Sequence, residues 1–534
     1  MKNMKKLFAI LVAALMIVAS MSALAATNDR NYDSSLTISG LTEGDTVNLY
    51  KVLEWVDGTG WALTEKFAGC TDVLAHINAK AELNNDDIAA LTAAANAGAS
   101  TFDSKKLEGT TTYTKDSGVE AGMYIALIDP ANADTVYNPI IVSSDFNGDN
   151  SSNTIGSDAT IPASDKAIAK KSTVTVTKTA DKTTLDAGDL AVHKEPVHFT
   201  ITTTIPAYSK GYTDPIFRVK DKLSTGLKLK RDSVKVTSGT VGHDATPDDI
   251  KEDSFTITFN PADILALATS QVVTIEYDAY FTNEAPFTVN EEDNDVTVEF
   301  SNNPDDETDV NKIIDKTRHY TFSIDGSLFG DESYKTGELV KVGKDSKGDI
   351  IESYKELSNK SKHGALSGAK FGLYTDAACT TLYTNAVFNG EVTTDGNGLM
   401  EINGLDVGTY YLKEISAPSG YIKDPNPHTI SIEAVIETET FTEKVDNKDV
   451  TYDMPVLKSY TITVDGNESS YTMTLNGPEI SSVTPGDSST EIVNTKGVEL
   501  PSTGGMGTTL FYIGGAVLVL GAVVVMITRR RVRG

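Results

Sequence analysis

Apolar residues gather in two long runs at the ends of the chain and alternate with polar residues through the body between them. The first run covers residues 7–21; it follows three lysines and precedes the small residues Ala23 and Ala25. A basic start, a short apolar core and an Ala-x-Ala site are typical of a cleaved secretory signal. We therefore expect residues 1–25 to be a signal peptide and the mature chain to begin near Ala26.

The second apolar run, residues 510–527, has about the 20-residue length that crosses a hydrocarbon core. It is followed by a basic cluster, Arg529, Arg530, Arg531 and Arg533. Such a cluster is retained on the cytoplasmic side of a membrane. The pattern predicts a membrane-spanning helix over residues 508–528, a cytoplasmic tail over 529–534, and a body that lies outside the cell.

The alternation within the body predicts a mostly β fold built from three tandem domains. Residues 26–165 indicate an α+β domain of immunoglobulin-like (Ig-like) type, with strands such as 47–52 and 122–127 and one helix over 86–98 that stops at a glycine. Residues 172–318 and 319–499 are rich in short strands joined by Gly, Pro and Asp turns, which is typical of β-sandwiches. Residues 166–171 link the first domain to the second.

Charge and cysteine content restrict the classes of function. The formal net charge is -29, and removing the seven positive charges of the signal and the tail brings it to -36. A body this acidic repels nucleic acid and anionic lipid. Its two cysteines, Cys70 and Cys379, are too few for a disulfide framework. Any covalent reinforcement of these exported domains must come from other chemistry.

The second domain places a lysine on the inward face of its first strand. Val174, Val176 and Lys178 share one face, and burial of an ammonium disfavours its charged form. Near the end of the domain Val296, Val298 and Phe300 define an inward face that continues to Asn302, with Asn303 as the alternative. A neutral lysine could attack the Asn302 side-chain carbonyl, assisted by a buried, protonated carboxyl, for which Asp221 is the candidate.

The third domain repeats this arrangement. Lys341 shares a strand face with Leu339, Asn494 shares one with Ile492, and Glu414 lies on a strand with aromatic neighbours between them. The two domains therefore predict intramolecular Lys178–Asn302 and Lys341–Asn494 isopeptide bonds, with Asp221 and Glu414 as the catalytic carboxyls.

Residues 500–504, Leu-Pro-Ser-Thr-Gly, stand directly before the apolar run. This pentapeptide resembles the LPXTG sorting signal of Gram-positive surface proteins, which a membrane transpeptidase (sortase) cuts between Thr and Gly. The resemblance implies cleavage between Thr503 and Gly504, Thr503 as the acyl donor, and attachment to peptidoglycan.

Further motifs resemble those of Gram-positive sortase-assembled pilins. Residues 410–421 resemble the E-box of these pilins, with Glu414 as its glutamate, and residues 492–496 resemble the terminal strand that supplies the crosslinking asparagine in collagen-adhesin B-type (CnaB) domains. Residues 217–227 resemble the Asp-containing segment of the preceding pilin domain. The resemblance implies tandem CnaA/CnaB-like Ig domains in a major pilin, the shaft-forming subunit of a cell-wall fimbria.

In such pilins a lysine of one subunit attacks the sortase-held threonine of another, which gives a head-to-tail polymer. The matching position here is Lys171, without the usual aromatic and proline, and Lys166 and Lys170 stay open as alternatives. The expected partners are further copies of this chain, pilin and housekeeping sortases, peptidoglycan, accessory pilins and a host surface ligand.

Other functions have less support in the residues. A monomeric wall-anchored adhesin or an accessory pilin at the tip or base is the alternative. The chain contains no His-Glu-x-x-His and no phosphate-binding Gly-Lys-Ser/Thr loop, so we expect neither an enzyme acting on an outside substrate nor a cofactor. Asp145, Asn147, Asp149 and Ser151 resemble the opening of a calcium loop, but Gly156 stands where a bidentate Glu belongs, so we expect a solvated loop without metal.

Overall fold

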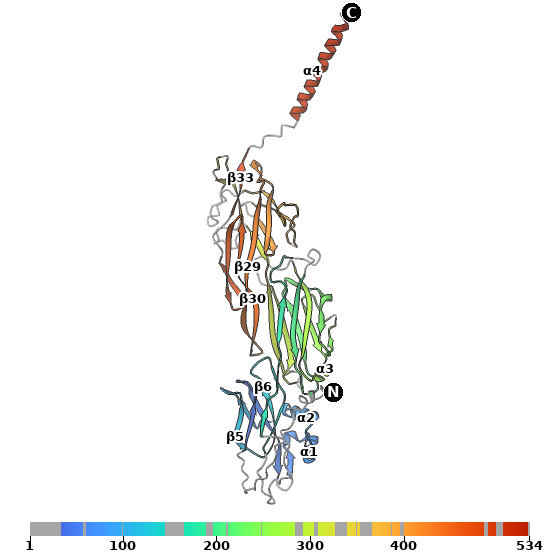
Figure 1. Cartoon of the computed structure of the whole chain (residues 1–534), viewed down its shortest axis with the longest axis vertical. Helices are drawn as coiled ribbons and strands as arrows, with labels where there is room; N and C mark the ends of the chain where they lie inside the picture. Colours follow the sequence, from blue (N-terminus) through green and yellow to red (C-terminus); the bar gives the residue numbers. More distant parts are fainter. Residues whose placement is uncertain are drawn as a thin grey trace, which may run out of the picture.

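The computed structural model describes residues 34–531 except 57–59, 99, 145–164, 188–195, 210–211, 247, 283–291, 304–307, 326–338, 346, 349, 353–365, 386, 396–399, 485–489 and 498–505. The predicted signal peptide, the Asp145–Ser151 loop, Thr503 and Gly504 lie outside the described residues. Figure 1 shows three β-rich bodies along the long axis of the molecule and a helix beyond the last of them. The predicted mostly β, tandem-domain fold is confirmed.

The first domain combines two main sheets, ordered β5-β1-β9 and β3-β2-β6-β8 with β4 on β2, and two helices. The predicted helix is α2, Asn85–Asn96, and it begins at a capping box in which Asn84 and Asp87 each bond the other's backbone N–H. The preceding helix α1, Thr71–Asn78, was not predicted. The elements are β1 Ser34–Ser39, β2 Thr46–Val56, β3 Gly60–Leu63, η1 Glu65–Phe67, α1, α2, β4 Asp103–Lys106, β5 Tyr113–Val119, β6 Gly122–Asp129, β7 Thr135–Tyr137, β8 Ile140–Ser144, β9 Lys166–Ile168 and β10 Lys171–Thr173.

The segment predicted as a linker is built into the first domain. β9 adds to β1 in parallel, and β10 pairs antiparallel with β7 so that Lys171 lies opposite Tyr137. Ala169 between them is buried in the core of the first domain. Residues 166–171 therefore occupy a fixed path at the junction with the second domain.

The second domain is a sandwich of two five-stranded sheets around one apolar core, as its alternating strands predict. One sheet runs β11-β12-β18-β14 with β15 on β18, and the other runs β16-β17-β13-β19-β20. The elements are β11 Val176–Ala180, β12 Val197–Ile205, β13 Phe217–Leu223, β14 Leu227–Leu229, η2 Arg231–Ser233, β15 Lys235–Thr237, β16 His243–Asp244, β17 Ser254–Phe259, α3 Pro261–Leu265, β18 Gln271–Phe281, β19 Glu292–Ser301 and β20 Val310–His319.

The third domain packs a seven-stranded sheet, β25-β24-β27-β29-β30-β31-β32, with a four-stranded sheet, β23-β22-β33-β28, and the pair β21-β26. Its first and last long strands, β22 and β33, are neighbours in parallel. The elements are β21 Phe322–Asp325, β22 Leu339–Lys344, β23 Ile350–Glu352, β24 Lys370–Tyr374, β25 Glu391–Thr393, β26 Glu401–Leu405, β27 Gly408–Ser416, β28 Tyr421–Ile422, β29 Pro427–Val445, β30 Lys448–Val464, β31 Asn467–Asn476, β32 Glu479–Thr484 and β33 Thr490–Lys496.

A long hairpin of the third domain, β29–β30, runs beside the second domain (Figure 1). Its turn residues Asp446 and Asn447 both have positive φ, as a tight hairpin turn requires. Near the tip Lys448 Nζ donates to Asn311 Oδ1 at 2.9 Å and lies 3.5 Å from Asp129 of the first domain. Val450 is buried in the core cluster of the second domain. The hairpin of the third domain thus makes noncovalent contacts with both other domains.

Replacing Val450 with aspartate should release the hairpin from the second domain. Val450 is 5 % exposed, so the new carboxyl group would be buried without a partner, at a cost of about 2–7 kcal/mol even in its protonated form. We expect faster hydrogen exchange along β20, which the hairpin covers, measured by mass spectrometry. Thr451→Asp is the matched control, because Thr451 is exposed on the same strand. Equal exchange in the two variants would contradict this bracing role.

The C-terminal helix α4, Met506–Arg531, matches the predicted span and includes part of the predicted tail. Its segment Phe511–Arg531 is long and apolar enough to cross a membrane and touches none of the three domains. Three arginines lie in its last turn.

Candidate functional site

The second domain contains a buried group of polar side chains, here called the middle cluster: Lys178, Asp221, Tyr277 and Asn294. Lys178 on β11 is 5 % exposed, Asp221 on β13 is 2 % exposed, and Asn294 on β19 is fully buried. Lys178 Nζ is hydrogen-bonded to the Asp221 carboxylate and donates to Asn294 Oδ1 at 2.7 Å. The two sheets of the sandwich thus bring a lysine, a carboxyl and an asparagine amide into direct contact.

Burial sets the protonation of this cluster. Loss of solvent lowers the pKa of Lys178 and raises the pKa of Asp221, and in each case the opposite charge of the partner opposes the shift. The rings of Phe199 and Tyr277 flank the ammonium, each with its centroid 5.6 Å from Nζ. The surroundings favour a neutral amine beside a neutral carboxyl, because neither charge has access to water.

The structure does not bring Asn302 to Lys178. Asn302 follows the end of β19, and its Nδ2 donates to the carboxylate of Asp309 at 3.1 and 3.3 Å. Asn303 also lies beyond the strand. The inward face of Val296, Val298 and Phe300 is as predicted, but it continues backward to Asn294 rather than forward to Asn302. Eight residues separate the two asparagines, or about 26 Å along a strand.

Sequence reasoning also missed Tyr277, which joins the other members of the middle cluster. Its hydroxyl donates to Asp221 Oδ2 at 3.0 Å and accepts from Asn294 Nδ2 at 2.9 Å. Its ring stacks on Phe199 with centroids 5.1 Å apart. In the sequence Tyr277 is one aromatic residue in an alternating strand, which is the ordinary pattern of an apolar core.

The third domain contains the C-terminal cluster: Lys341, Glu414 and Asn494, all fully buried. Lys341 Nζ lies 3.3 Å from Glu414 Oε1, and Asn494 Nδ2 donates to Glu414 Oε2 at 2.8 Å. A second bond from Nδ2 to the Ile422 carbonyl, 2.6 Å, fixes the amide. The structure therefore brings together all three residues that the sequence analysis selected in this domain.

The C-terminal cluster depends on the parallel pairing of β22 with β33. Lys341 lies opposite Ile492 and Gly343 opposite Asn494, so the lysine and the asparagine are near neighbours on adjacent strands. Burial lowers the pKa of Lys341, and the charge of Glu414 opposes that shift. The ring of Phe371 lies 5.1 Å from its Nζ and closes the site on another side. The Glu414 carboxyl group thus lies between Lys341 and the Asn494 amide and contacts both of them.

Lys171 lies on the surface at the junction of the first two domains. Its Nζ donates to Thr42 Oγ1 at 3.1 Å, and this hydroxyl lies 3.2 Å from the hydroxyl of Tyr137. Tyr137 in turn donates to the buried carboxylate of Asp45 at 2.7 Å. The exposed ammonium is thus the end of a hydrogen-bond chain that starts inside the first domain.

The two other candidate linking lysines are also exposed. Lys166 begins β9, and the Lys170 carbonyl accepts from the Asn138 N–H at 3.1 Å. Partial burial lowers the pKa of Lys170. All three amines are therefore accessible at the junction of the first two domains.

The first domain offers no equivalent buried cluster in the part of the chain that the structure describes. Lys51 pairs with Glu120, but the Glu120 side chain is 54 % exposed. This pair is open to water, unlike the fully enclosed side chains of Lys178 and Asp221 or of Lys341 and Glu414. Cys70 and Cys379 are free thiols.

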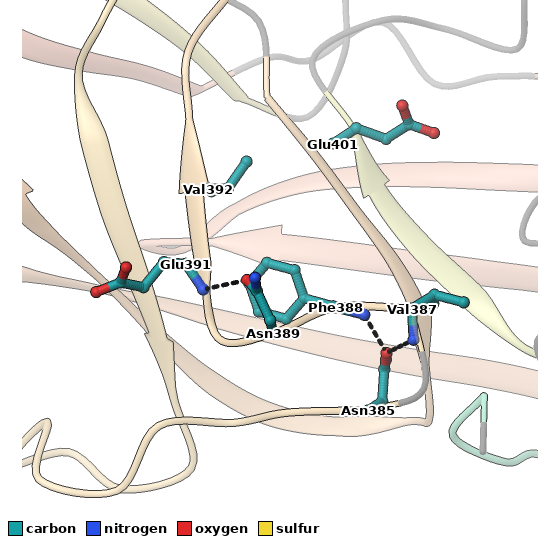
Figure 2. Close-up of a pocket in the computed structure, with 7 residues that line it drawn as sticks. All are labelled: Asn385, Val387, Phe388, Asn389, Glu391, Val392 and Glu401. Carbon is teal, nitrogen blue, oxygen red and sulfur yellow. Dashed lines mark hydrogen bonds between the residues drawn. The ribbon is translucent and has the colours of Figure 1, made fainter. Parts of the chain in front are cut away.

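A shallow pocket of about 340 Å³ lies beside β25 and β26 in the third domain (Figure 2). Polar groups of its lining are hydrogen-bonded to one another: Asn385 Oδ1 accepts from the backbone N–H groups of Val387 and Phe388, at 2.9 and 2.7 Å. None of the residues of the two lysine clusters lines it. Among the described residues no group of three or more His, Cys, Asp or Glu side chains is arranged to hold a metal.

Three family models match separate parts of the chain. Residues 31–179 match a T6 antigen Ig-like domain, residues 355–448 a SpaA prealbumin-like fold domain, and residues 492–532 the LPXTG cell wall anchor motif. The first match ends at the junction that carries Lys171. The last includes Asn494, the sorting signal and α4.

Whole-chain comparisons agree with these matches. The chain is 27 % identical to the trypsin-resistant surface T6 protein of Streptococcus pyogenes serotype M6, over 93 % of this chain and 95 % of that protein. Together these matches support a sortase-assembled backbone pilin. The structure of the T6 backbone pilin of serotype M6 Streptococcus pyogenes matches this pilin with a TM-score of 0.56 and 19 % identity, over 88 % of this chain and 100 % of that one. The major pilin SpaD of Corynebacterium diphtheriae matches with a TM-score of 0.46 and 20 % identity, over 76 % and 93 %.

The pilin is accordingly an exported protein of the cell wall surface, as predicted. The T6 structure supports its tandem-domain fold, and the anchor match accounts for α4 and the residues before it.

Proposed function

We propose that this pilin is the shaft subunit of a covalent pilus, joined by sortase between Thr503 of one copy and Lys171 of the next. Two bonds formed by the chain itself, Lys178–Asn294 and Lys341–Asn494, reinforce the second and third domains. The observation that carries the proposal is the contact of a fully buried lysine with both a carboxyl and an asparagine amide in the middle cluster. Such a group is costly to bury, and covalent bond formation removes the lysine charge permanently.

Each internal bond forms by aminolysis of an amide. The neutral lysine Nζ attacks the asparagine Cγ, and the carboxyl group of Asp221 or Glu414 exchanges protons with the reacting groups. The Cγ–Nδ2 bond then breaks and ammonia leaves with one proton from the lysine. No oxidant or cofactor is consumed, so the chain catalyses its own modification and acts on no other substrate.

The polymer bond uses chemistry supplied by sortase. Cleavage between Thr503 and Gly504 leaves the Thr503 acyl group on the enzyme, and the Lys171 amine takes it to form an amide. Lys171 is favoured because its Nζ is held by Thr42 at the surface of a fixed strand. Seven residues separate Thr503 from Lys496 at the end of β33, so the two domains that are joined lie within about 25 Å of each other.

The same bond chemistry defines the partners. Pilin sortase joins copies of the chain, and housekeeping sortase transfers the finished fibre to peptidoglycan. Accessory pilins and a host surface ligand are further partners in this proposal.

Replacing Asn294 with alanine should remove the bond of the second domain, whereas replacing Asn302 should not. The wild-type protein is expected to be lighter than its sequence by about 34 Da, or about 17 Da for each ammonia lost. Asn294→Ala should keep only one loss of about 17 Da, because Lys178 then has no acceptor. Intact-protein mass spectrometry and mapping of the linked peptides provide the measurement.

Asn302→Ala is the matched control, because the Asn302 side-chain amide donates to Asp309, outside the middle cluster. A double mass loss in Asn294→Ala, or a linked peptide that contains Asn302, would reject Asn294 as the acceptor. A wild-type mass equal to that of the sequence would reject both internal bonds.

A further inference from the structure

The hydroxyl of Tyr277 lies between the carboxyl and the leaving group of the proposed reaction. Asp221 Oδ2 accepts from this hydroxyl at 3.0 Å, and Asn294 Nδ2, the nitrogen that leaves as ammonia, donates to it at 2.9 Å. The hydroxyl is fully buried with its ring between Phe199 and Phe255, whose centroids lie 5.1 and 5.0 Å away. The Tyr277 hydroxyl therefore contacts Asp221 and Asn294 at the same time, without any rotation of the ring.

The two clusters of this chain reach the leaving nitrogen by different routes. In the C-terminal cluster Glu414 Oε2 accepts directly from Asn494 Nδ2 at 2.8 Å. In the middle cluster the carboxyl is an aspartate, one methylene shorter, and its hydrogen bonds go to Lys178 and Tyr277. The tyrosine hydroxyl occupies the gap between Asp221 and the Asn294 amide.

The breakdown of the tetrahedral intermediate requires a proton at this nitrogen. An amide nitrogen is a poor leaving group until it is protonated, and the only acid in contact with Asn294 Nδ2 among the described side chains is the Tyr277 hydroxyl. Burial and the nearby Asp221 raise the pKa of Tyr277 well above its ordinary value, so it does not act by losing its proton in the resting state. It can pass a proton on only if Asp221 replaces that proton in the same step.

We propose that Tyr277 is a catalytic residue of the second domain that relays a proton from Asp221 to the departing nitrogen of Asn294. This inference rests on the internal bond proposed above. In the relay the hydroxyl proton moves to Nδ2, the proton of the Asp221 carboxyl moves to the tyrosine oxygen, and Asp221 regains a proton from the attacking Lys178 amine. The bond from Nζ to Cγ forms, the bond from Cγ to Nδ2 breaks, ammonia leaves, and both Tyr277 and Asp221 return to their starting forms.

Tyr277→Phe tests the relay because it keeps the ring and removes only the hydroxyl. We expect the freshly purified full-length variant to have lost about 17 Da, from the third domain alone, whereas the wild type has lost about 34 Da. Linked-peptide mapping during incubation at 37 °C should show the Lys178–Asn294 bond forming at least 100-fold more slowly than in the wild type. Tyr280→Phe, which removes a hydroxyl outside the cluster from the same strand, should behave as the wild type.

Two further variants separate catalysis from folding. Lys178→Ala gives the stability of a second domain without its bond, and Tyr277→Phe should melt at the same temperature as this variant. Asp221→Glu combined with Tyr277→Phe should restore the bond, since a glutamate reaches the amide directly in the third domain.

The remaining outcomes decide against the relay. A full loss of about 34 Da in fresh Tyr277→Phe, or a melting temperature well below that of Lys178→Ala, would overturn it. The first result would leave the proposed internal bonds intact. An unshifted wild-type mass would instead reject the internal bonds themselves, so the two failures are distinguishable.

Discussion

Lys178→Ala and Lys341→Ala should each leave a folded pilin that is less stable in one domain and lacks one internal bond. The bonds close loops of 116 residues between Lys178 and Asn294 and 153 residues between Lys341 and Asn494. By the loop-closure model used for other covalent crosslinks, each bond stabilises its domain by about 5 kcal/mol. The loss corresponds to a melting temperature lower by roughly 10–25 °C for the domain affected. Calorimetry resolves the domains, and mass spectrometry counts the bonds.

Lys220→Ala is the matched control for the second domain. Lys220 lies next to Asp221 on β13, but its side chain points outward to Glu299 and is 44 % exposed. Exposed ion pairs contribute at most about 1 kcal/mol, so this variant should retain its mass loss and nearly all of its stability. If the second domain of Lys178→Ala has the same melting temperature as that of Lys220→Ala, no covalent bond stabilises the domain.

Lys171→Ala in the native producer should abolish the ladder of covalent oligomers on a denaturing gel. In the proposed linkage the Lys171 amine is the nucleophile that accepts the Thr503 acyl group, and alanine has no amine to replace it. Monomeric pilin should still reach the cell wall, because wall attachment uses Thr503 alone. The measurement is an immunoblot of wall extracts, and the expected change is complete loss of species larger than the monomer.

Lys171→Arg, Lys166→Ala and Lys170→Ala complete this test. Arginine preserves the charge and the contact with Thr42 but cannot act as the acceptor at neutral pH, so it should also abolish the ladder. The two alanine variants should polymerise normally. A ladder that survives Lys171→Ala and disappears in Lys170→Ala or Lys166→Ala would transfer the linkage to that lysine.

The alternation of apolar and polar residues predicted which side chains of a strand point inward more reliably than it predicted which of those side chains meet. Lys341, Glu414 and Asn494 are brought together because each stands in phase with apolar neighbours on a long strand. In the second domain the same argument selected Lys178, and it identified the inward face of β19. A period of two does not say which end of that face meets the lysine; Asn294 sits among Glu292, Asp293 and Asp295, which in sequence resemble a solvated turn.

Other features depend on tertiary contacts that leave little trace in sequence. The role of Tyr277 arises because two sheets place its hydroxyl between Asp221 and Asn294. The strands of the β29–β30 hairpin have an alternating pattern, but that pattern does not reveal that the tip extends to the first domain. The short strands β9 and β10 at residues 166–171 also had no distinctive pattern, because Ala169, between the two strands, is the only buried residue of that segment.

The position of Asn294 on β19, the strand before the last, has a mechanical consequence. Pulling force that passes through the proposed Lys178–Asn294 bond enters β19 near its start and leaves the domain at the end of β20. Asn294 is paired with Thr317, so these two points are neighbours and the force opens the ladder between them pair by pair. The 23 residues between them would add about 75 Å to each subunit once opened.

Side-chain contacts at the end of this ladder resist its opening. Arg318, 1 % exposed, donates to both carboxylate oxygens of Asp293, from Nε at 2.6 Å and from Nη2 at 2.8 Å, at the end of the ladder where separation begins. A bidentate Arg–carboxylate pair is stronger than a single hydrogen bond and has a defined geometry, so its two hydrogen bonds break together. Opening of the ladder in the proposed fibre must therefore break this pair, together with the contacts of Arg318 to the Pro478 carbonyl and to Glu479.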